Sequence, residues 1–175
     1  MKFMVIDVES IGLYGDAFAV ARVVVDSGSG ETLEEVGLAC DPNVCSGDPA
    51  DREWIRQNVP PLEITNGSWR DMLHSFWRAW RKWAEQGVAM MVDCGYPVET
   101  NFLSDVVVSE RENRKWLAPY PLYDLASILL ASGVDPREAF DRQENELPMH
   151  DPLADARQSA RILLEVLGRL EGVRG

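Results

Sequence analysis

Three consecutive β-rich segments at the start of the chain constrain its fold more than any other feature. They are residues 3–8 (FMVIDV), 17–26 (AFAVARVVVD) and 32–40 (TLEEVGLAC). Clusters of glycine and aspartate separate these segments, and short polar turns of this kind join neighbouring antiparallel strands. The pattern therefore predicts an antiparallel sheet of three strands before the first long helix.

A second pattern, in residues 68–87, predicts an amphipathic helix. Large apolar side chains recur there at spacings of four and three residues, as they do on one face of a helix: Trp69, Leu73, Phe76, Trp80 and Trp83. Ser68 is a suitable N-cap, and Gly87 is suited to end the helix. We expect the apolar face to pack on the sheet and His74, on the opposite face, to be solvated.

The remaining segments predict alternating short strands and helices. We expect a buried strand at 88–93 (VAMMVD), then a helix at 96–107 (YPVETNFLSDVV) with Pro97 as its first residue. Residues 120–132 fit a helix or a strand followed by a helix, and residues 151–172 fit a long closing helix. The proline-bearing stretch 41–61 is expected to be irregular.

This order of elements predicts an α/β fold built on a mixed sheet. Three antiparallel strands come first and parallel strands are added later, with residues 3–8 in the central strand and helices on both faces. The chain has 175 residues, of which 46% are hydrophobic. A chain of this size and composition forms one globular domain, which we expect to span residues 1–175.

Composition argues against several classes of function. The 29 acidic and 17 basic residues give a formal charge of -12, which disfavours broad attraction to phosphate backbones or anionic membranes. No apolar stretch reaches the roughly 20 residues that a membrane span needs, and the first ten residues turn acidic too soon for a signal peptide. The three cysteines form no CxxC pair, so neither a disulfide framework nor a zinc site is indicated. We expect a cytoplasmic protein that binds no membrane.

Two acidic residues end the first predicted strand. Side chains alternate along a strand, so Asp7 and Glu9 point to the same face, about 7 Å apart. Two carboxylates beside an apolar central strand repel each other and lose solvation unless a cation or a proton neutralises them. The alternative is that Glu9 starts an exposed turn and Asp7 binds only the backbone.

A histidine and an aspartate surround the start of the closing helix. Asp151 precedes Pro152, which suits the pair for the N-cap and the first helical position. Asp155 then falls at the end of the first turn, while His150 stays on the preceding loop. By themselves, His150 fits an ordinary loop residue and Asp155 an ordinary acid near a helix N-terminus.

Together, these motifs resemble those of a known enzyme superfamily. VIDVES (5–10), the acid-bearing junction DCGYPVETNFL (93–103) and HDPLADA (150–156) are similar, in this order, to the three motifs of the DEDDh 3′-to-5′ exonucleases. The resemblance covers almost the whole chain and implies a ribonuclease-H-like fold, of the type of a small bacterial or phage exoribonuclease.

The middle motif departs from the family pattern. The family has roughly His-Asn-x3-Asp-x2-Phe-Leu, and in this chain the position of the aspartate before Phe102 and Leu103 holds Glu99. Asp93, six residues earlier, is the other candidate. We favour Glu99, whose register matches, and keep Asp93 as an alternative ligand or as a group behind the ligands.

The resemblance implies a metal-dependent exonuclease that releases nucleoside 5′-monophosphates. Its expected catalytic residues are Asp7, Glu9, Glu99, His150 and Asp155. The acids, with Asp93 as the alternative, are expected to hold two Mg²⁺ or Mn²⁺ ions, because hard oxygen ligands without thiolates select these metals. His150 has the family's role of general base, which suits an imidazole near neutral pH.

The resemblance also indicates where a substrate would bind. SIGL (10–13) is similar to the family's TTGL, which implies that Ser10, Ile11, Gly12 and Leu13 hold the terminal nucleotide. Apart from the resemblance, Tyr96 and Tyr14 are candidate stacking partners. We expect 3′ ends of single-stranded RNA, or short oligonucleotides, as substrates. A 3′-to-5′ exodeoxyribonuclease and a catalytically degenerate nucleic-acid-binding module are the alternatives.

Two further features stay open at this point. Many family members are homodimers, so a homodimer is compatible with the resemblance. Residues 141–148 (DRQENELP) are polar and fit either a flap that orders on substrate or an ordinary surface loop.

Overall fold

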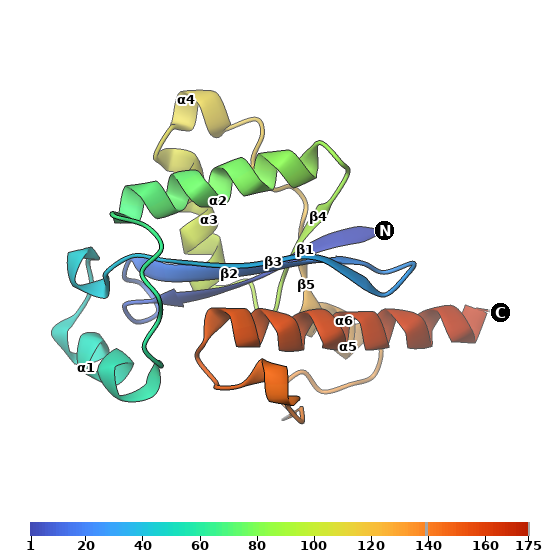
Figure 1. The fold of residues 1–175 in the computed structure, drawn as a ribbon. Coiled ribbons are helices and arrows are strands. Elements are labelled where there is room, and N and C mark those ends of the chain that lie inside the picture. The colour runs from blue at the N-terminus through green and yellow to red at the C-terminus, as the bar shows by residue number, and fades with distance from the viewer. Residues whose placement is uncertain (139, 175) are drawn as a thin grey trace.

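A single mixed sheet of five strands forms the centre of the molecule (Figure 1). The computed structural model describes residues 1–138 and 140–174, the last four by their backbone alone. The strands are β1 (Lys2–Ser10), β2 (Ala17–Asp26), β3 (Glu31–Ala39), β4 (Ala89–Val92) and β5 (Leu122–Asp124), in the order β3-β2-β1-β4-β5. β1, β2 and β3 pair antiparallel, whereas β4 and β5 add parallel to β1. The predicted sheet, with its first strand central, is confirmed.

Helices cover both faces of this sheet (Figure 1). α2 and α3 lie on one face, and α5 and α6 lie on the other, as the two sets of core contacts also show. The helices are η1 (Pro42–Val44), α1 (Pro49–Asn58), α2 (Trp69–Ala84), α3 (Val98–Val108), α4 (Arg111–Arg114), α5 (Leu125–Ala131), η2 (Glu144–Glu146) and α6 (Pro152–Arg174). In the part of the chain that is described, no helix combines the length and the apolar character that crossing a membrane would require.

Alternation along β1 decides which side chains face which helices. Met4 and Ile6 pack in the core beneath α2 and α3, whereas Phe3 and Val5 pack in the core beneath α5 and α6. Because successive side chains point to opposite faces, Asp7 belongs to the same face as Val5. β1 therefore presents its acidic end toward the side of the sheet that α6 covers.

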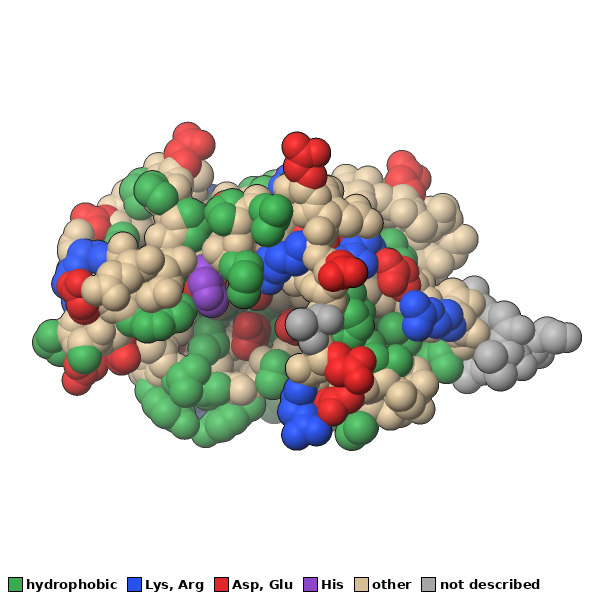
Figure 2. Space-filling view, turned by 90° about the horizontal axis from the view of Figure 1, so that it is seen from below, with side chains coloured by type: hydrophobic (Ala, Val, Ile, Leu, Met, Phe, Trp, Pro, Cys, Tyr) green, Lys and Arg blue, Asp and Glu red, His purple; other side chains and the backbone are tan. Residues whose placement is uncertain are grey.

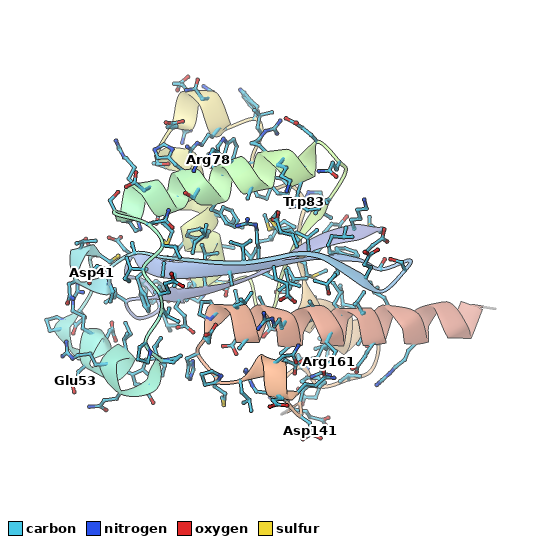
Figure 3. All side chains as sticks on the ribbon, in the orientation of Figure 1. Asp41, Glu53, Arg78, Trp83, Asp141 and Arg161 are labelled. Atoms are coloured by element: carbon cyan, nitrogen blue, oxygen red, sulfur yellow. The ribbon has the colours of Figure 1, made fainter. Side chains whose placement is uncertain are left out.

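Helix α2 is fixed to the sheet by an apolar stripe and by one half-buried carboxylate. Ser68 caps the helix as predicted, since its side chain accepts a hydrogen bond from the Asp71 N–H. Trp83, labelled in Figure 3, is buried against the sheet, and its Nε1 donates to Glu34 Oε1 of β3 at 2.9 Å. The predicted amphipathic helix is confirmed in position and in orientation.

Three local predictions were wrong. The stretch 41–61 is not irregular throughout, because it contains α1, which the Asp48 side chain caps ahead of Pro49. Pro97 is the N-cap of α3 rather than its first residue. His74 is not simply solvated: its Nδ1 lies 2.6 Å from Nη2 of the buried Arg114, because α4 folds back against α2.

Candidate active site

The C-terminal end of β1 carries the first two predicted acids. Asp7 and Glu9 lie opposite Ala21 and Ala19 of β2, two small residues, and the ladder shifts register just after Glu9. The chain leaves the sheet at that irregularity, so these two carboxylates lie where the strand ends.

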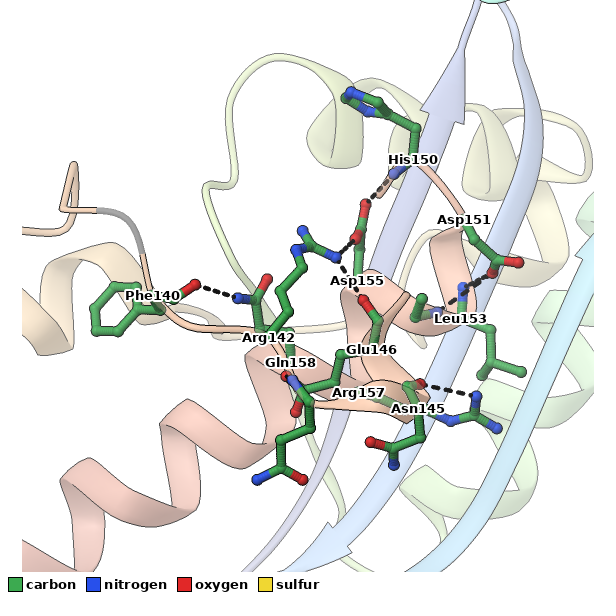
Figure 4. Close-up of polar contacts among 12 residues, drawn as sticks. Phe140, Arg142, Asn145, Glu146, His150, Asp151, Leu153, Asp155, Arg157 and Gln158 are labelled. Carbon is green, nitrogen blue, oxygen red and sulfur yellow. Dashed lines mark hydrogen bonds and ion pairs between the residues drawn. The ribbon is translucent and has the colours of Figure 1, made fainter. Parts of the chain in front are cut away.

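The N-terminus of α6 supplies the second pair. The Asp151 Oδ1 accepts hydrogen bonds from the backbone N–H groups of Leu153 and Ala154, and it caps the helix as predicted (Figure 4). His150 precedes this cap with a left-handed backbone, φ 62°, and its N–H donates to Asp155 Oδ2 at 3.0 Å. Asp155 in the first turn therefore fixes the loop that carries the imidazole.

The sheet and the helix bring three of these groups together. His150 Nδ1 lies 3.8 Å from Glu9 Oε1. One potential ligand atom from each of Glu9, His150 and Asp155 lies within 4.8 Å of the others. The imidazole also packs against Trp54 of α1 in a T-shaped arrangement, with the ring centroids 5.1 Å apart. Residues from β1, α1 and α6, far apart in sequence, thus form one cluster.

The cluster disfavours negative charge. Burial, followed by the charges of Asp155, Glu9, Glu99 and Asp93, raises the pKa of Asp7 well above its ordinary value. Burial, followed by the charge of Asp155, raises the pKa of Glu9 to about 8. Carboxylates with such pKa values are stabilised in the charged form by a bound cation.

Both candidates for the middle acid lie near Asp7, because each raises its pKa. Glu99, in the first turn of α3, is 8% exposed, and burial raises its pKa to about 7. Asp93 directly follows β4, and the pKa of its carboxyl group is raised by removal from solvent, then by Asp124 and Asp155. The β1–β4 ladder ends with the pair of Ile6 and Val92. Because the two strands are parallel, Asp93 follows Val92 at the level at which Asp7 follows Ile6.

Asp124 is a further acid at this edge that was not predicted. It caps α5 by accepting a hydrogen bond from the Ser127 N–H, and it also accepts from the Gly95 N–H at 2.9 Å. Its charge raises the pKa of both Asp93 and Glu99. An aspartate just before a helix is the sequence signal that would have indicated it.

A pocket of about 370 Å³ opens beside Glu9. Its walls come from the end of β1, the following turn, α1 and the start of α3: Val8, Glu9, Ser10, Gly12, Leu13, Asp51, Trp54 and Val98. Gly12 has φ +66°, and a Cβ there would lie 2.1 Å from Asp51 Oδ2. Glycine therefore suits position 12 mainly through its left-handed backbone, and its lack of a side chain leaves room for the Asp51 carboxylate.

The predicted substrate residues divide into two groups. Ser10, Gly12 and Leu13 line the pocket, and Leu13 is exposed. Ile11 is 1% exposed and packs in the core, so only its backbone, and not its side chain, is available to a substrate. Tyr96 is exposed and does not line the pocket. It lies beside Tyr14, and the hydrogen bond between the two side chains raises the pKa of Tyr14.

Figure 2 shows this edge of the molecule as a hollow. Acidic side chains lie at its base, a histidine lies on its rim, and hydrophobic side chains gather along one side. The hollow thus combines an acidic floor, which attracts cations, with an apolar wall.

Residues 141–148 are fastened to α6 rather than free. Glu146 is buried and receives Arg161 Nε at 2.6 Å and Arg161 Nη2 at 2.9 Å. Arg142 pairs with Asp155 and donates to the Glu146 carbonyl oxygen at 2.9 Å. The Arg161 side chain of α6 accordingly reaches Asp141, whose carbonyl oxygen accepts from its Nη2 at 2.9 Å, and both residues are labelled in Figure 3. The segment is therefore anchored to α6 in this structure.

Comparisons with known proteins give matches among solved structures. Neither a scan against protein-family models nor a search of curated proteins finds a match. A full-length 3′-exonuclease matches with a TM-score of 0.51 and 12% identity, over 96% of this chain and 82% of that chain. A 3′-exonuclease solved for its 3′-end specific recognition of a histone mRNA stem-loop matches with a TM-score of 0.52 and 11% identity, over the same shares.

A third structure, the nuclease domain of 3′hExo, a DEDDh family member bound to rAMP, matches with a TM-score of 0.47 and 13% identity, over 96% of this chain and 92% of that chain. The first two likenesses, at such low identity, show a common fold. The predicted fold class, an α/β ribonuclease-H-like mixed sheet, is confirmed.

Proposed function

We propose that the chain is a metal-dependent 3′-to-5′ exonuclease that removes nucleoside 5′-monophosphates from the 3′ ends of single-stranded RNA or short oligonucleotides. The observation that carries this proposal is the meeting of Glu9, Asp155 and His150 at one sheet edge, next to Asp7. The fold, which it has in common with solved 3′-exonucleases, supports the same conclusion.

The chemistry of the acidic groups fits divalent cations. Glu9 and Asp155 offer carboxylate oxygens within 4.8 Å of each other and of a His150 nitrogen, and no described cysteine belongs to the group. Carboxylate oxygens without thiolates favour Mg²⁺ or Mn²⁺. The residues that would hold these ions are Asp7, Glu9, Asp155 and the middle acid, for which we propose Glu99 ahead of Asp93.

Bound divalent ions would supply Lewis acidity, which lowers the pKa of water and stabilises negative charge on the phosphate and the leaving oxygen. The side chains of the protein would supply the general base and hold it in position. His150 accepts the proton of the attacking water, and Asp155, through the His150 N–H, holds the loop that carries the imidazole. Trp54 limits the movement of the ring by its T-shaped contact.

The pocket beside Glu9 provides a subsite for the terminal nucleotide. Leu13 and Trp54 give it apolar surface that can contact a base, while Ser10 and the Gly12 backbone lie at the turn next to the acids. A terminal base in this pocket would place its 5′ phosphate toward the acidic cluster. We therefore propose that the enzyme acts on the last nucleotide of a strand rather than within it.

RNA is the preferred substrate in this proposal, with DNA as the alternative. One structurally similar 3′-exonuclease recognises the 3′ end of a histone mRNA stem-loop. Proteins distinguish the two sugars by contacts to the 2′-hydroxyl. We would incubate the protein with labelled single-stranded RNA and DNA of equal sequence in Mn²⁺. Faster shortening of RNA supports the preference; faster shortening of DNA makes the chain an exodeoxyribonuclease.

Two observations favour a second candidate, a catalytically degenerate nucleic-acid-binding module. Glu99 stands where the resembled family has aspartate, and Arg142 already pairs with Asp155. Isothermal titration with Mn²⁺ separates the two functions. Binding that Asp7→Asn removes supports the enzyme, whereas lack of Mn²⁺ binding near neutral pH supports the binding module.

A further inference from the structure

Arg142 places a positive charge directly on one of the proposed metal ligands. Its Nη1 contacts Asp155 Oδ1 and also donates to the Glu146 carbonyl oxygen at 2.9 Å (Figure 4). Both side chains are largely shielded, with 19% of Arg142 and 16% of Asp155 exposed. The contact is therefore a partly buried ion pair that the loop before α6 holds in place.

This ion pair uses the oxygen of Asp155 that the backbone leaves free. Asp155 Oδ2 accepts the His150 N–H at 3.0 Å, and Oδ1 accepts the guanidinium of Arg142. Both oxygens are thus engaged by donors, one neutral and one cationic. A cation that binds Asp155 would share this carboxylate with a guanidinium. Two positive charges at such a short distance repel each other.

The guanidinium acts on the acidic groups beyond Asp155. Its charge lowers the pKa of Asp93 against the raising effects of burial, Asp124 and Asp155. In a chain with a net charge of -12, it offsets part of the repulsion among carboxylates at this edge. Its place beside the cluster is thus that of a counter-ion.

We propose that Arg142 is an internal counter-ion that a divalent metal ion displaces from Asp155, and that the released guanidinium then binds the phosphate of the terminal nucleotide. The inference rests on the proposed function, because it takes Asp155 as a metal ligand. A guanidinium presents parallel N–H donors that match two phosphate oxygens. The bond to the Glu146 carbonyl keeps the side chain beside the cluster when Asp155 is taken by the ion.

The first test measures metal affinity without catalysis. Isothermal titration with Mn²⁺ should give about 10-fold tighter binding for Arg142→Ala than for the unsubstituted protein, because one charge-assisted hydrogen bond to Asp155 no longer competes. Arg142→Lys, which keeps the charge, should bind Mn²⁺ nearly as the unsubstituted protein does. Unchanged or weaker Mn²⁺ binding by Arg142→Ala overturns the counter-ion role, since an arginine that only positions Asp155 would help the metal.

Arg157, on the helix α6 that carries Asp155, provides a matched control. Its Nη2 pairs with Glu35, and its Nη1 donates to the Asn145 carbonyl oxygen of the same loop at 3.2 Å. Arg157→Ala therefore removes an equal charge and one loop contact while it leaves Asp155 alone. Its Mn²⁺ affinity should change by less than about 2-fold. A tightening equal to that of Arg142→Ala would show that net charge, rather than competition at Asp155, causes the effect.

The second test concerns the phosphate. With Ca²⁺ in place of Mn²⁺ to slow turnover, a fluorescent single-stranded oligonucleotide should bind about 10-fold more weakly to Arg142→Ala, and Arg142→Lys should recover part of the loss. Unchanged oligonucleotide binding overturns the phosphate role. If the unsubstituted protein binds no divalent ion, the proposed function itself fails. If it binds the ion but Arg142→Ala changes neither Mn²⁺ nor oligonucleotide affinity, only the inference about Arg142 is rejected.

Discussion

His150 is held on three sides by contacts of different kinds. Its backbone is left-handed, its N–H is bonded to Asp155, and its ring meets Glu9 and Trp54. A left-handed backbone is uncommon outside glycine and persists where surrounding contacts hold it. The loop thus keeps the imidazole at the acidic cluster, where the proposed hydrolysis would use it as a base.

Removing the His150 ring tests this role. His150→Ala should retain Mn²⁺ and oligonucleotide affinity but lose about 10²- to 10⁴-fold in turnover, the usual effect of losing a general base. The deficit should shrink as pH rises, because hydroxide becomes available without the base. Turnover over a pH series, with Mn²⁺ titration alongside, checks both statements.

Asp155→Ala is the comparison for this variant. It removes a proposed metal ligand, so it should weaken Mn²⁺ binding, and excess Mn²⁺ should restore part of the turnover. Unchanged turnover in His150→Ala, or a loss of metal binding as complete as that of Asp155→Ala, would contradict the assignment of His150 as the base.

At the scale of elements, strong periodic patterns were predicted well and weak ones were missed. β1, β2 and β3 alternate or run continuously apolar, and α2 has a wide aromatic stripe, so local sequence determined each of them. Helix α1 buries only Ile55 and has no such stripe. Its start was nevertheless encoded, because Asp48 and Pro49 form an N-cap followed by a proline at the first turn.

The site was predictable where its residues come in pairs along the chain. Asp7 with Glu9, and His150 with Asp155, have spacings that a strand and a helix start convert directly into geometry. Arg142, Asp51 and Trp54 were not predicted as site residues. Each reaches the site from a loop or from the short helix α1, and such contacts depend on tertiary structure rather than on spacing.

The contacts of Glu34, which attach α2 to β3, predict how the stability of the protein depends on pH. Burial would raise the pKa of Glu34, but hydrogen bonds from Lys82, Trp83 and Arg22 lower it to about 2. Glu34→Gln should lower the free energy of unfolding at pH 7 by about 1–3 kcal/mol, since a charged hydrogen-bond acceptor is lost. A lowered pKa adds stability above about pH 4.5 that is lost as pH falls toward 2, so the difference should shrink there.

Urea unfolding at pH 7 and at pH 2.5 would measure this difference. Glu31→Gln, at the exposed start of the same strand, is the control and should stay within about 0.5 kcal/mol of the unsubstituted protein. An equal loss at both pH values would show that Glu34 contributes by packing rather than by its charge.

For the whole molecule, the acidic cluster makes metal-free stability depend on pH. The pKa of Glu9 is raised to about 8 and that of Glu99 to about 7, so the folded state binds more protons than the unfolded state between about pH 4.5 and 8. The contribution of these two carboxyl groups to the free energy of unfolding should therefore be greatest below about pH 4.5. It should fall as the pH rises through their pKa values in the folded state.

Thermal unfolding in chelator and in Mn²⁺ checks this dependence. In chelator, the Tm should be about 5 °C or more lower at pH 8 than at pH 5, because the cluster must ionise without a counter-charge. Mn²⁺ should raise the Tm at pH 8 much more than at pH 5, since the ions bind ionised carboxylates. A metal-free protein that is equally stable at both pH values would contradict the raised pKa values of the cluster.

The same cluster is the basis of the proposed activity, and one measurement tests it most directly. A single-stranded RNA labelled at its 5′ end is incubated with the protein in Mn²⁺, and its products are resolved by length over time. We expect a ladder that shortens one nucleotide at a time from the 3′ end with release of nucleoside 5′-monophosphates, and no shortening in chelator or with a folded Asp7→Asn variant. Internal fragments at the earliest times, or equal shortening by Asp7→Asn, would contradict the account.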